Sequence, residues 1–195
     1  MDRGFDFSGK NAYVIQYAEE LNNMVPCGAI GDFTAAFGGK TSAQGRRAFS
    51  AGSSTIAKGD YSHTEGSNTV TLGTSSHAEG AGTMARGDYS HSEGNQTLAF
   101  GSASHAENTE TKAVGNNSHA GGWKSEAKTN YSFVHGAGAI THASFESQTV
   151  FGQWNLPTQS RLIVGSGSSS NRKNIFEVRA NGDICMHYQG KMYSL

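Results

Sequence analysis

The segment Ser62-His63-Thr64-Glu65-Gly66 decides the fold of this chain, because close copies of it return every 14 residues. Copies that keep a histidine at the second position and a glutamate at the fourth occupy 76–80, 90–94 and 104–108. Looser copies occupy 34–38, 48–52, 118–122 and 132–136. A second series with the same period lies halfway between, at 41–45, 55–59, 69–73, 83–87, 97–101, 111–115, 125–129 and 139–143. A fixed period sustained over this length is the signature of a repeat protein.

Each half of the repeat consists of five alternating residues followed by a two-residue corner. Strict alternation predicts a β-strand with two unlike faces. The first, third and fifth residues are small, so we expect them to face a narrow interior, whereas the larger second and fourth residues face outward. The glycine that ends each strand permits the positive φ that a sharp corner needs. We therefore predict an all-β parallel solenoid, with two strands per 14-residue coil and a coil spacing of roughly 4.8 Å.

The composition agrees with a thin core and excludes several classes of partner. The 195 residues include 26 glycines, only 35% are hydrophobic, and the formal net charge is −1. An aromatic content of 10% argues against a disordered chain. The balanced charge offers no electrostatic footprint for nucleic acid, and no apolar run is long enough for membrane insertion. We also expect no cofactor.

The coil pattern Ser/Thr-x-Ala-x-Gly-x-x-Ser-x-Ala-x-Gly resembles the head domain of trimeric autotransporter adhesins. The Ser-His-Ala-Glu-Gly variant resembles repeats in the tail fibres of bacteriophages. The resemblance covers residues 31–152 and implies a left-handed parallel β-roll that assembles as a homotrimer. The adhesin heads favour aliphatic residues at outward positions where this chain has His and Glu. The N-terminal residues do not read as a secretory signal, which favours the phage-fibre branch.

The resemblance also implies a function. It suggests a non-catalytic fibre or receptor-binding protein, located on a virion or another extracellular surface. Its partners would be two further copies of itself, a phage tail or baseplate component, and a bacterial surface glycan or protein.

Three segments are expected along the chain. Residues 1–30 form an attachment or trimerisation segment, in which 11–25 is predicted to be an amphipathic helix because Val14, Tyr17, Leu21 and Met24 follow helical spacing. Residues 31–152 form the roll, whose repeat slips by two residues at 148–152. Residues 153–195 form a small β module, with a hairpin turn at Asn181-Gly182.

The outward positions of one strand series place like residues above each other. The histidine column contains His63, His77, His91, His105 and His119, and the carboxylate column contains Glu65, Glu79, Glu93 and Glu107. His and Glu are good metal ligands, so an array of ions is one interpretation. We favour an ordered ladder of hydrogen-bond donors and acceptors without a metal ion. Five equivalent rungs are more typical of a structural repeat than of a single ion-binding site.

The other strand series carries an apolar column, which consists of Ile56, Val70, Met84 and Leu98. An apolar stripe on a slim solenoid is too large to leave exposed to water. We therefore expect at least one outward face, either this column or the His and Glu columns, to be buried between three protomers.

Aromatic residues supply the candidate ligand-binding positions. Four lie at or near corners, namely Tyr61, Tyr89, Trp123 and Tyr131, and three lie in the C-terminal module, namely Trp154, Tyr188 and Tyr193. Exposed rings beside polar groups suit stacking on sugars. The alternative is that a corner ring only covers the edge of the solenoid, and we favour this alternative at the corners.

Three other functions compete with receptor binding. A tail-borne glycan hydrolase needs a pair of carboxylates across a cleft, and Glu110, Glu126 and Glu146 show no such pairing by spacing. Ice binding would use the threonines at 55, 69, 83, 97 and 111, but these fall in the inward-facing phase. The third alternative is a purely structural spacer.

Overall fold

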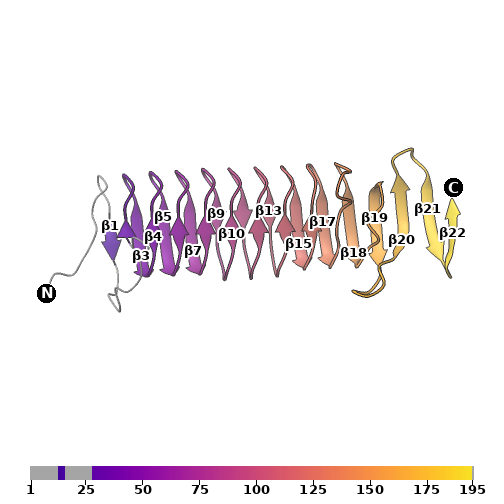
Figure 1. The fold of residues 1–195 in the computed structure, drawn as a ribbon, viewed down its shortest axis with the longest axis horizontal. Coiled ribbons are helices and arrows are strands. Elements are labelled where there is room, and N and C mark those ends of the chain that lie inside the picture. Colours follow the sequence, from indigo (N-terminus) through magenta and orange to yellow (C-terminus); the bar gives the residue numbers. More distant parts are fainter. Residues whose placement is uncertain (1–12, 16–27, 195) are drawn as a thin grey trace.

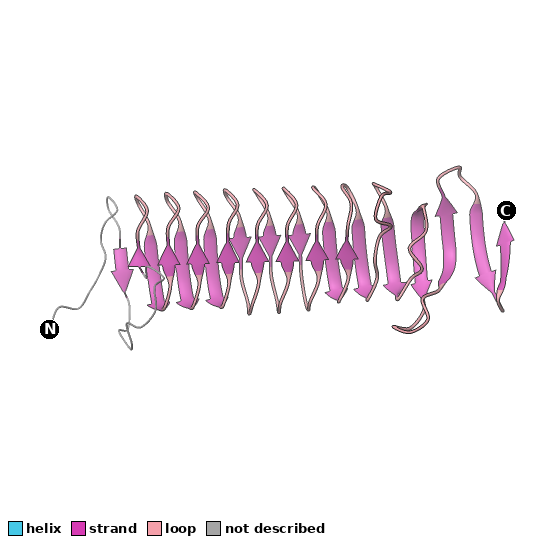
Figure 2. Cartoon of the chain, viewed as in Figure 1, coloured by secondary structure: helices cyan, strands magenta, loops and turns pink. Residues whose placement is uncertain are grey.

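The protein is an elongated stack of β-coils along one axis (Figure 1). A computed structural model describes residues 13–15 and 28–194, and this part of the chain contains strands and no helix. The coils stack side by side from β2 to the C-terminal strands (Figure 2). The predicted all-β solenoid is therefore confirmed.

Two sheets form the walls of the solenoid. The longer sheet has 14 strands in the order β1 (Tyr13–Ile15), β3 (Ala35–Gly39), β5 (Phe49–Ser53), β7 (His63–Ser67), β9 (His77–Ala78), β11 (His91–Ser92), β13 (His105–Ala106), β15 (His119–Trp123), β17 (Phe133–Ala137), β18 (Thr149–Gln153), β19 (Ser160–Ser166), β20 (Asn174–Arg179), β21 (Ile184–Tyr188) and β22 (Lys191–Ser194). The shorter sheet contains β2 (Gly28–Ala29), β4 (Ser42–Ala43), β6 (Ile56–Ala57), β8 (Val70–Thr71), β10 (Met84–Ala85), β12 (Leu98–Ala99), β14 (Lys112–Ala113) and β16 (Glu126–Ala127).

The strand register confirms the 14-residue coil. Throughout the repeat, each strand pairs in parallel with the strand one coil further on, so that His63 lies beside His77 and Met84 beside Leu98. Odd-numbered strands up to β17 lie in one sheet and even-numbered strands up to β16 in the other, which gives two strands per coil. In-register stacking places chemically similar residues next to each other in columns.

The interior is as narrow as the small residues predict. Alanines from both sheets are fully buried, and so are the inward serines and threonines, including Thr55, Thr69, Thr97 and Thr111. Many of the buried hydroxyls have partners nearby: Ser62 Oγ donates to the Gly59 carbonyl at 2.7 Å, and Thr97 Oγ1 donates to the Glu93 carbonyl at 3.0 Å. A polar interior is stable here because these buried groups are hydrogen-bonded.

An added Cβ would overlap the backbone of the next coil in both strand series, but only one series has a positive φ at its glycines, which corrects one expectation. Those of the longer sheet, such as Gly52 and Gly66, do have a positive φ. Those of the shorter sheet, such as Gly59 and Gly101, do not; an added Cβ there would overlap the backbone of the glycine in the next coil. The left-handed residue of that corner lies two positions further on and is often not glycine, as at Tyr61.

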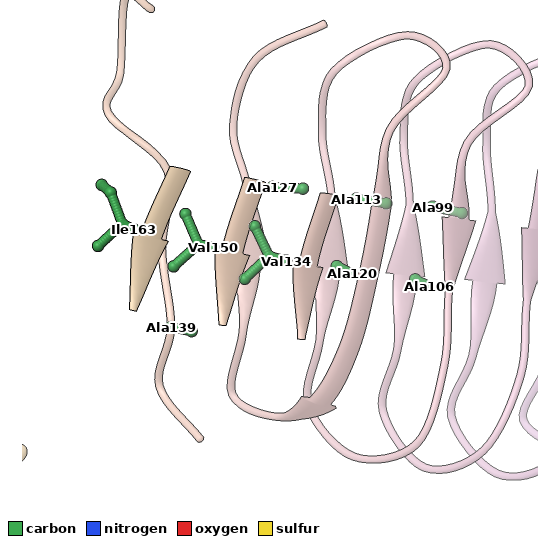
Figure 3. Close-up of a cluster of buried hydrophobic side chains, with 9 residues drawn as sticks. All are labelled: Ala99, Ala106, Ala113, Ala120, Ala127, Val134, Ala139, Val150 and Ile163. Carbon is green, nitrogen blue, oxygen red and sulfur yellow. The ribbon is translucent and has the colours of Figure 1, made fainter. Parts of the chain in front are cut away.

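The buried core residues become larger toward the C-terminal end of the solenoid. The core changes from alanine to Val134, Val150 and Ile163, which are all fully buried and lie in one line along the stack (Figure 3). Gly136 pairs with Gly152, so this coil has 16 residues and the predicted two-residue slip is confirmed. Larger residues fill the space that the longer coil opens.

The C-terminal strands extend the longer sheet instead of starting a separate one. Strand β19 pairs in parallel with β18 and in antiparallel with β20. Strands β20, β21 and β22 then form an antiparallel meander. The turn between β20 and β21 contains Asn181 and Gly182, as the sequence predicts.

The predicted helix 11–25 is wrong where the structure describes it. Tyr13–Ile15 forms strand β1, which pairs in parallel with Ala35–Phe37 of β3. Aromatic and β-branched residues favour a strand, and the otherwise open edge of β3 supplies hydrogen-bond partners that an isolated helix lacks. The rest of 11–25 lies outside the described residues. No membrane-spanning helix occurs in the described ranges.

Candidate functional site

The histidine column forms a continuous aromatic ladder on the outer face of the longer sheet. The rings of His63, His77, His91 and His105 stack with centroid distances of 4.6–4.8 Å and interplanar angles of 2–19°. Phe49 and Phe133 occupy the same column and continue the ladder at its two ends. The parallel register alone produces this stack, because each ring repeats at the coil spacing.

Each of the later histidines pairs with the glutamate of the preceding coil. Nε2 of His91, His105 and His119 lies 3.4, 3.1 and 3.3 Å from a carboxylate oxygen of Glu79, Glu93 and Glu107, respectively. The side chains of both columns are about one quarter to one half exposed. The structure therefore brings the predicted His and Glu residues together as one half-buried ladder.

Stacking also changes the acid–base properties of this ladder. Burial lowers the pKa of His77 below its ordinary value of 6.5, and the neighbouring His91 lowers it further, against the opposing effect of nearby carboxylates. The pKa of His63 and of His119 is lowered for the same reasons. Nε2 of His63 and of His77 has no hydrogen-bond partner although it is buried. Burial and stacking therefore disfavour the protonated form of these imidazoles.

The apolar column lies on the outer face of the shorter sheet. Ile56, Val70, Met84 and Leu98 pair in register and are each half-buried within one chain. Lys112 and Glu126 follow in the same column and interrupt it. The apolar column is therefore limited to the first half of the stack.

The corner aromatics divide into packed and exposed rings. Arg46 and Arg47 lie over the ring of Tyr61 at 5.4 and 5.5 Å. The side chains of Tyr89 and Tyr131 are 67% and 62% exposed. All three tyrosines have a positive φ, so they are positioned by the turn of the coil. They lie in the same corner column but not in adjacent coils.

The two tryptophans meet each other, which the sequence did not predict. Trp123 and Trp154 pack edge to face with centroids 6.1 Å apart. Arg172 lies 5.1 Å over the Trp154 ring and donates hydrogen bonds to the carbonyls of Gly138 and Asn155. This cluster ties the last coil of the repeat to the loop before β20.

An apolar surface at the C-terminal end escaped the sequence reasoning. Beyond the histidine ladder, the same outer face of the longer sheet carries Phe133, Phe151, Leu162, Val164, Phe176, Val178, Ile184, Met186 and Tyr193, which we call the outer apolar patch. Register places Phe151, Val164, Phe176, Met186 and Tyr193 in one row across five strands. The alternation in β19 and β20 was visible in the sequence, but only the continuous sheet joins these strands to the roll.

The most exposed members of the outer apolar patch lie on the last two strands. Phe133 is 36% exposed, Phe151 43%, Met186 52% and Tyr193 53%. Tyr188, another predicted binding residue, is 65% exposed on β21. All residues of β22 are exposed, and its outer edge is unpaired within the described chain. An exposed edge strand with apolar side chains is a surface for association.

A buried carboxylate lies on the inner side of the meander. Glu177 is 5% exposed and is surrounded by Thr158, Ser160, Asn174 and His187. Burial alone would raise the pKa of the Glu177 carboxyl, but the donated hydrogen bonds and the nearby imidazole hold it below its ordinary value. The cluster fixes the negative charge where β19, β20 and β21 meet.

Each glutamate considered for glycan hydrolysis contacts a different polar residue. Glu110 and Glu126 line one open hollow together with Lys112 and Lys124. Glu110 lies 3.4 Å from Lys124, and Glu126 lies 3.7 Å from Lys128. Glu146 instead accepts a hydrogen bond from Asn130 at 2.8 Å. Spacing suggested no pair, yet the coil register places Glu110 and Glu126 along the same hollow.

Comparison with known proteins adds no family to this description. No protein-family model matches the chain, and no curated protein matches its sequence. The class that the fold defines is a parallel β-solenoid with 14-residue coils.

Proposed function

We propose that this protein is a non-catalytic fibre component that assembles as a homotrimer and binds a receptor on a bacterial surface. The observation that carries the proposal is the outer apolar patch at one end of a rod. The rod supplies length and stiffness, because every coil is hydrogen-bonded to the next. The patch and the exposed edge of β22 supply the association surface.

Trimer formation would remove apolar surface that one chain leaves in contact with water. The outer apolar patch crosses six strands, from β17 to β22, and its most exposed members lie on the last two. Each Å² of apolar surface removed from water contributes about 25 cal/mol. The half-buried apolar column of the shorter sheet is the second surface that three chains would share. We assign the principal interface to the outer apolar patch, because its side chains are larger and more exposed.

The setting of the protein is proposed from the repeat. The Ser-His-Ala-Glu-Gly coils resemble those of bacteriophage tail fibres, so we place the protein on a virion or a comparable extracellular particle. In this arrangement a tail or baseplate component binds near β1, and the bacterial glycan or protein binds near β22. The exposed Tyr188 is the residue that we expect to contact the receptor, because Tyr193, the other tyrosine predicted in this module, belongs to the outer apolar patch.

Sedimentation of the full chain tests the trimer and the interface together. We expect the mass of three chains at micromolar concentration. Met186→Glu places a charge in the outer apolar patch and should dissociate the trimer, whereas Met84→Glu, the matched change in the apolar column, should weaken it less. A stable monomer would refute the trimer. Dissociation by Met84→Glu alone would move the interface to the shorter sheet.

Binding to immobilised bacterial glycans and to whole bacterial cells tests the receptor function. We expect binding without any released sugar product, and loss of binding in Tyr188→Ala with the trimer intact. Tyr89→Ala, at an exposed corner, is the matched control. Release of product would favour the glycan hydrolase, and absence of binding in both assays would favour a structural spacer.

A further inference from the structure

The carboxylate column is interrupted at Gly121, and this interruption brings together a glutamate and a histidine that lie two coils apart. In the carboxylate column the residue 14 positions after Glu107 is Gly121, and the next is His135. Because Gly121 has no side chain, Glu107 and His135 reach toward each other across two coil steps. Nδ1 of His135 lies 3.7 Å from Oε1 of Glu107. The same oxygen lies 3.3 Å from Nε2 of His119.

We propose that Glu107, His119 and His135 form a binding site for a divalent transition-metal cation of the zinc class. Two imidazole nitrogens and one carboxylate oxygen are a ligand set that Zn²⁺ takes in proteins, with water in the fourth position. The three ligand atoms lie within 4.8 Å of one another. The site is complete within one chain, so the proposal does not depend on the trimer.

Two of the three distances between ligand atoms are close to those of tetrahedral coordination. With metal–ligand bonds of about 2.0–2.1 Å, two ligand atoms of a tetrahedral site are about 3.3 Å apart. The His119–Glu107 distance already has this value, and the His135–Glu107 distance exceeds it by a few tenths of an ångström. The His135 side chain is 49% exposed, so it has room to move that far.

Three of the repeated rungs also bring two histidines and a glutamate within 4.8 Å of one another, but their rings are arranged differently. The rings of His77, His91 and His105 are almost parallel and 4.8 Å apart. An imidazole lone pair lies in the plane of its ring, so parallel stacked rings direct their lone pairs alongside each other and not toward one ion. His119 leaves this stack, because its ring is turned by 85° from that of His105. We expected no metal ion from the sequence because the His and Glu rungs repeat equivalently. This cluster lies instead where glycine replaces glutamate in the carboxylate column.

Glu107 is the least exposed member of the cluster. Its side chain is only 25% exposed, which limits competition from water for the carboxylate.

Gly121 provides a sharp test of the site. A Cβ at this position would lie 2.6 Å from both Glu107 Oε1 and His135 Nδ1, between the two ligand atoms. The backbone tolerates alanine, because Gly121 has no positive φ and Ala51 occupies the same column in an earlier coil. Gly121→Ala should therefore fold and yet close the site.

The experiment is a Co²⁺ titration of the full chain, followed by visible absorption and by competition with Zn²⁺. We expect one tetrahedral ion per chain. Removal of a ligand should weaken binding at least about 100-fold, since loss of an outer partner alone costs 10–100-fold. Both Gly121→Ala and His135→Gln should show this loss. His142→Gln, at a histidine outside the ladder that accepts a hydrogen bond from Ser144, should bind like the wild type.

A circular dichroism spectrum and a thermal midpoint that match those of the wild type confirm that each variant is folded. Should one of the two variants unfold, the other still decides the result. Equal affinity in wild type, Gly121→Ala and His135→Gln would overturn the proposal, because the ion would then lie elsewhere. Absence of tetrahedral absorption, or weak binding of several ions that no variant changes, would overturn it as well.

Discussion

Substitution of Gly101 by alanine should locally separate two coils of the solenoid. Gly101 is buried, and an added Cβ would overlap the carbonyl of Gly115 in the next coil. That carbonyl accepts a hydrogen bond from the buried Ser118 hydroxyl at 2.6 Å. Beside it, Phe100 N–H donates to the Ala113 carbonyl at 2.8 Å. Relief of the overlap turns the Gly115 carbonyl away from the added Cβ, which weakens the bond from Ser118, and separates the two coils, which weakens the bond from Phe100.

The magnitude follows from the two hydrogen bonds. Loss of the backbone bond costs about 1 kcal/mol net, and a buried hydroxyl without a partner costs about 1–3 kcal/mol. We therefore expect Gly101→Ala to lower the free energy of unfolding by about 3 kcal/mol. Gly39→Ala is the matched control, because its Cβ would meet nothing within 4 Å and its φ is not positive.

Denaturant unfolding followed by circular dichroism measures both variants. Gly39→Ala should leave the free energy of unfolding within about 1 kcal/mol of the wild type, or raise it, because alanine reduces the entropy of the unfolded chain. Hydrogen exchange should show faster exchange at the coils around Gly101 in the first variant only. Equal stability of the two variants would refute the argument that coil contact, and not corner conformation, requires this glycine.

Three further changes test other parts of the structure. Ile163→Ala should lower the free energy of unfolding by about 3 kcal/mol, because Ile163 is fully buried; Ile175→Ala, at a residue 45% exposed, should cost less than half as much in the same denaturation assay. The free energy of unfolding should fall as the pH drops from 7.5 through 6.5 to 5.5. The pKa of His63, His77 and His119 is lowered in the folded protein, so at a pH between that lowered pKa and 6.5 the unfolded chain binds more protons than the folded chain. His77→Phe should reduce this pH dependence, and phenylalanine fits the column because Phe133 already occupies it. An unchanged pH profile would contradict the lowered pKa of His77. Glu177→Gln should cost about 2 kcal/mol by thermal or denaturant unfolding, since a neutral amide replaces a carboxylate held by four polar neighbours, and a loss below 0.5 kcal/mol would contradict that role.

Much of the solenoid was predictable because the residue pattern that specifies each coil is short and repeats along the chain. The alternation in 62–66 gave a strand with an inner and an outer face, and the constant period gave the coil length and the register. Small residues at the inner positions predicted the thin core that Ala99 and Thr97 form. One local argument was wrong: glycine was assigned to corner conformation in both strand series, although Gly101 is required by contact with the next coil. That contact joins residues a full coil apart and is not visible within one half-repeat.

The N-terminal segment shows why short patterns mislead. Apolar residues in 11–25 fit helical spacing, yet Tyr13–Ile15 is a strand. The deciding factor is the edge of β3, which offers backbone partners to any extended segment that reaches it. Helical spacing over so few residues carries little free energy against such pairing.

The sequence by itself determined the coil, its period and the columns of like residues. Each coil repeats the same local pattern, so stacking the coils in parallel register places like residues next to each other. Only the tertiary structure decided how the exceptions combine. It placed the strands after the repeat in the same sheet, which gathered Phe151, Met186 and Tyr193 into one apolar patch. It also brought Glu107 and His135 together across the space left by Gly121. Such contacts depend on the distance between coils and on side-chain length, which a linear pattern does not contain.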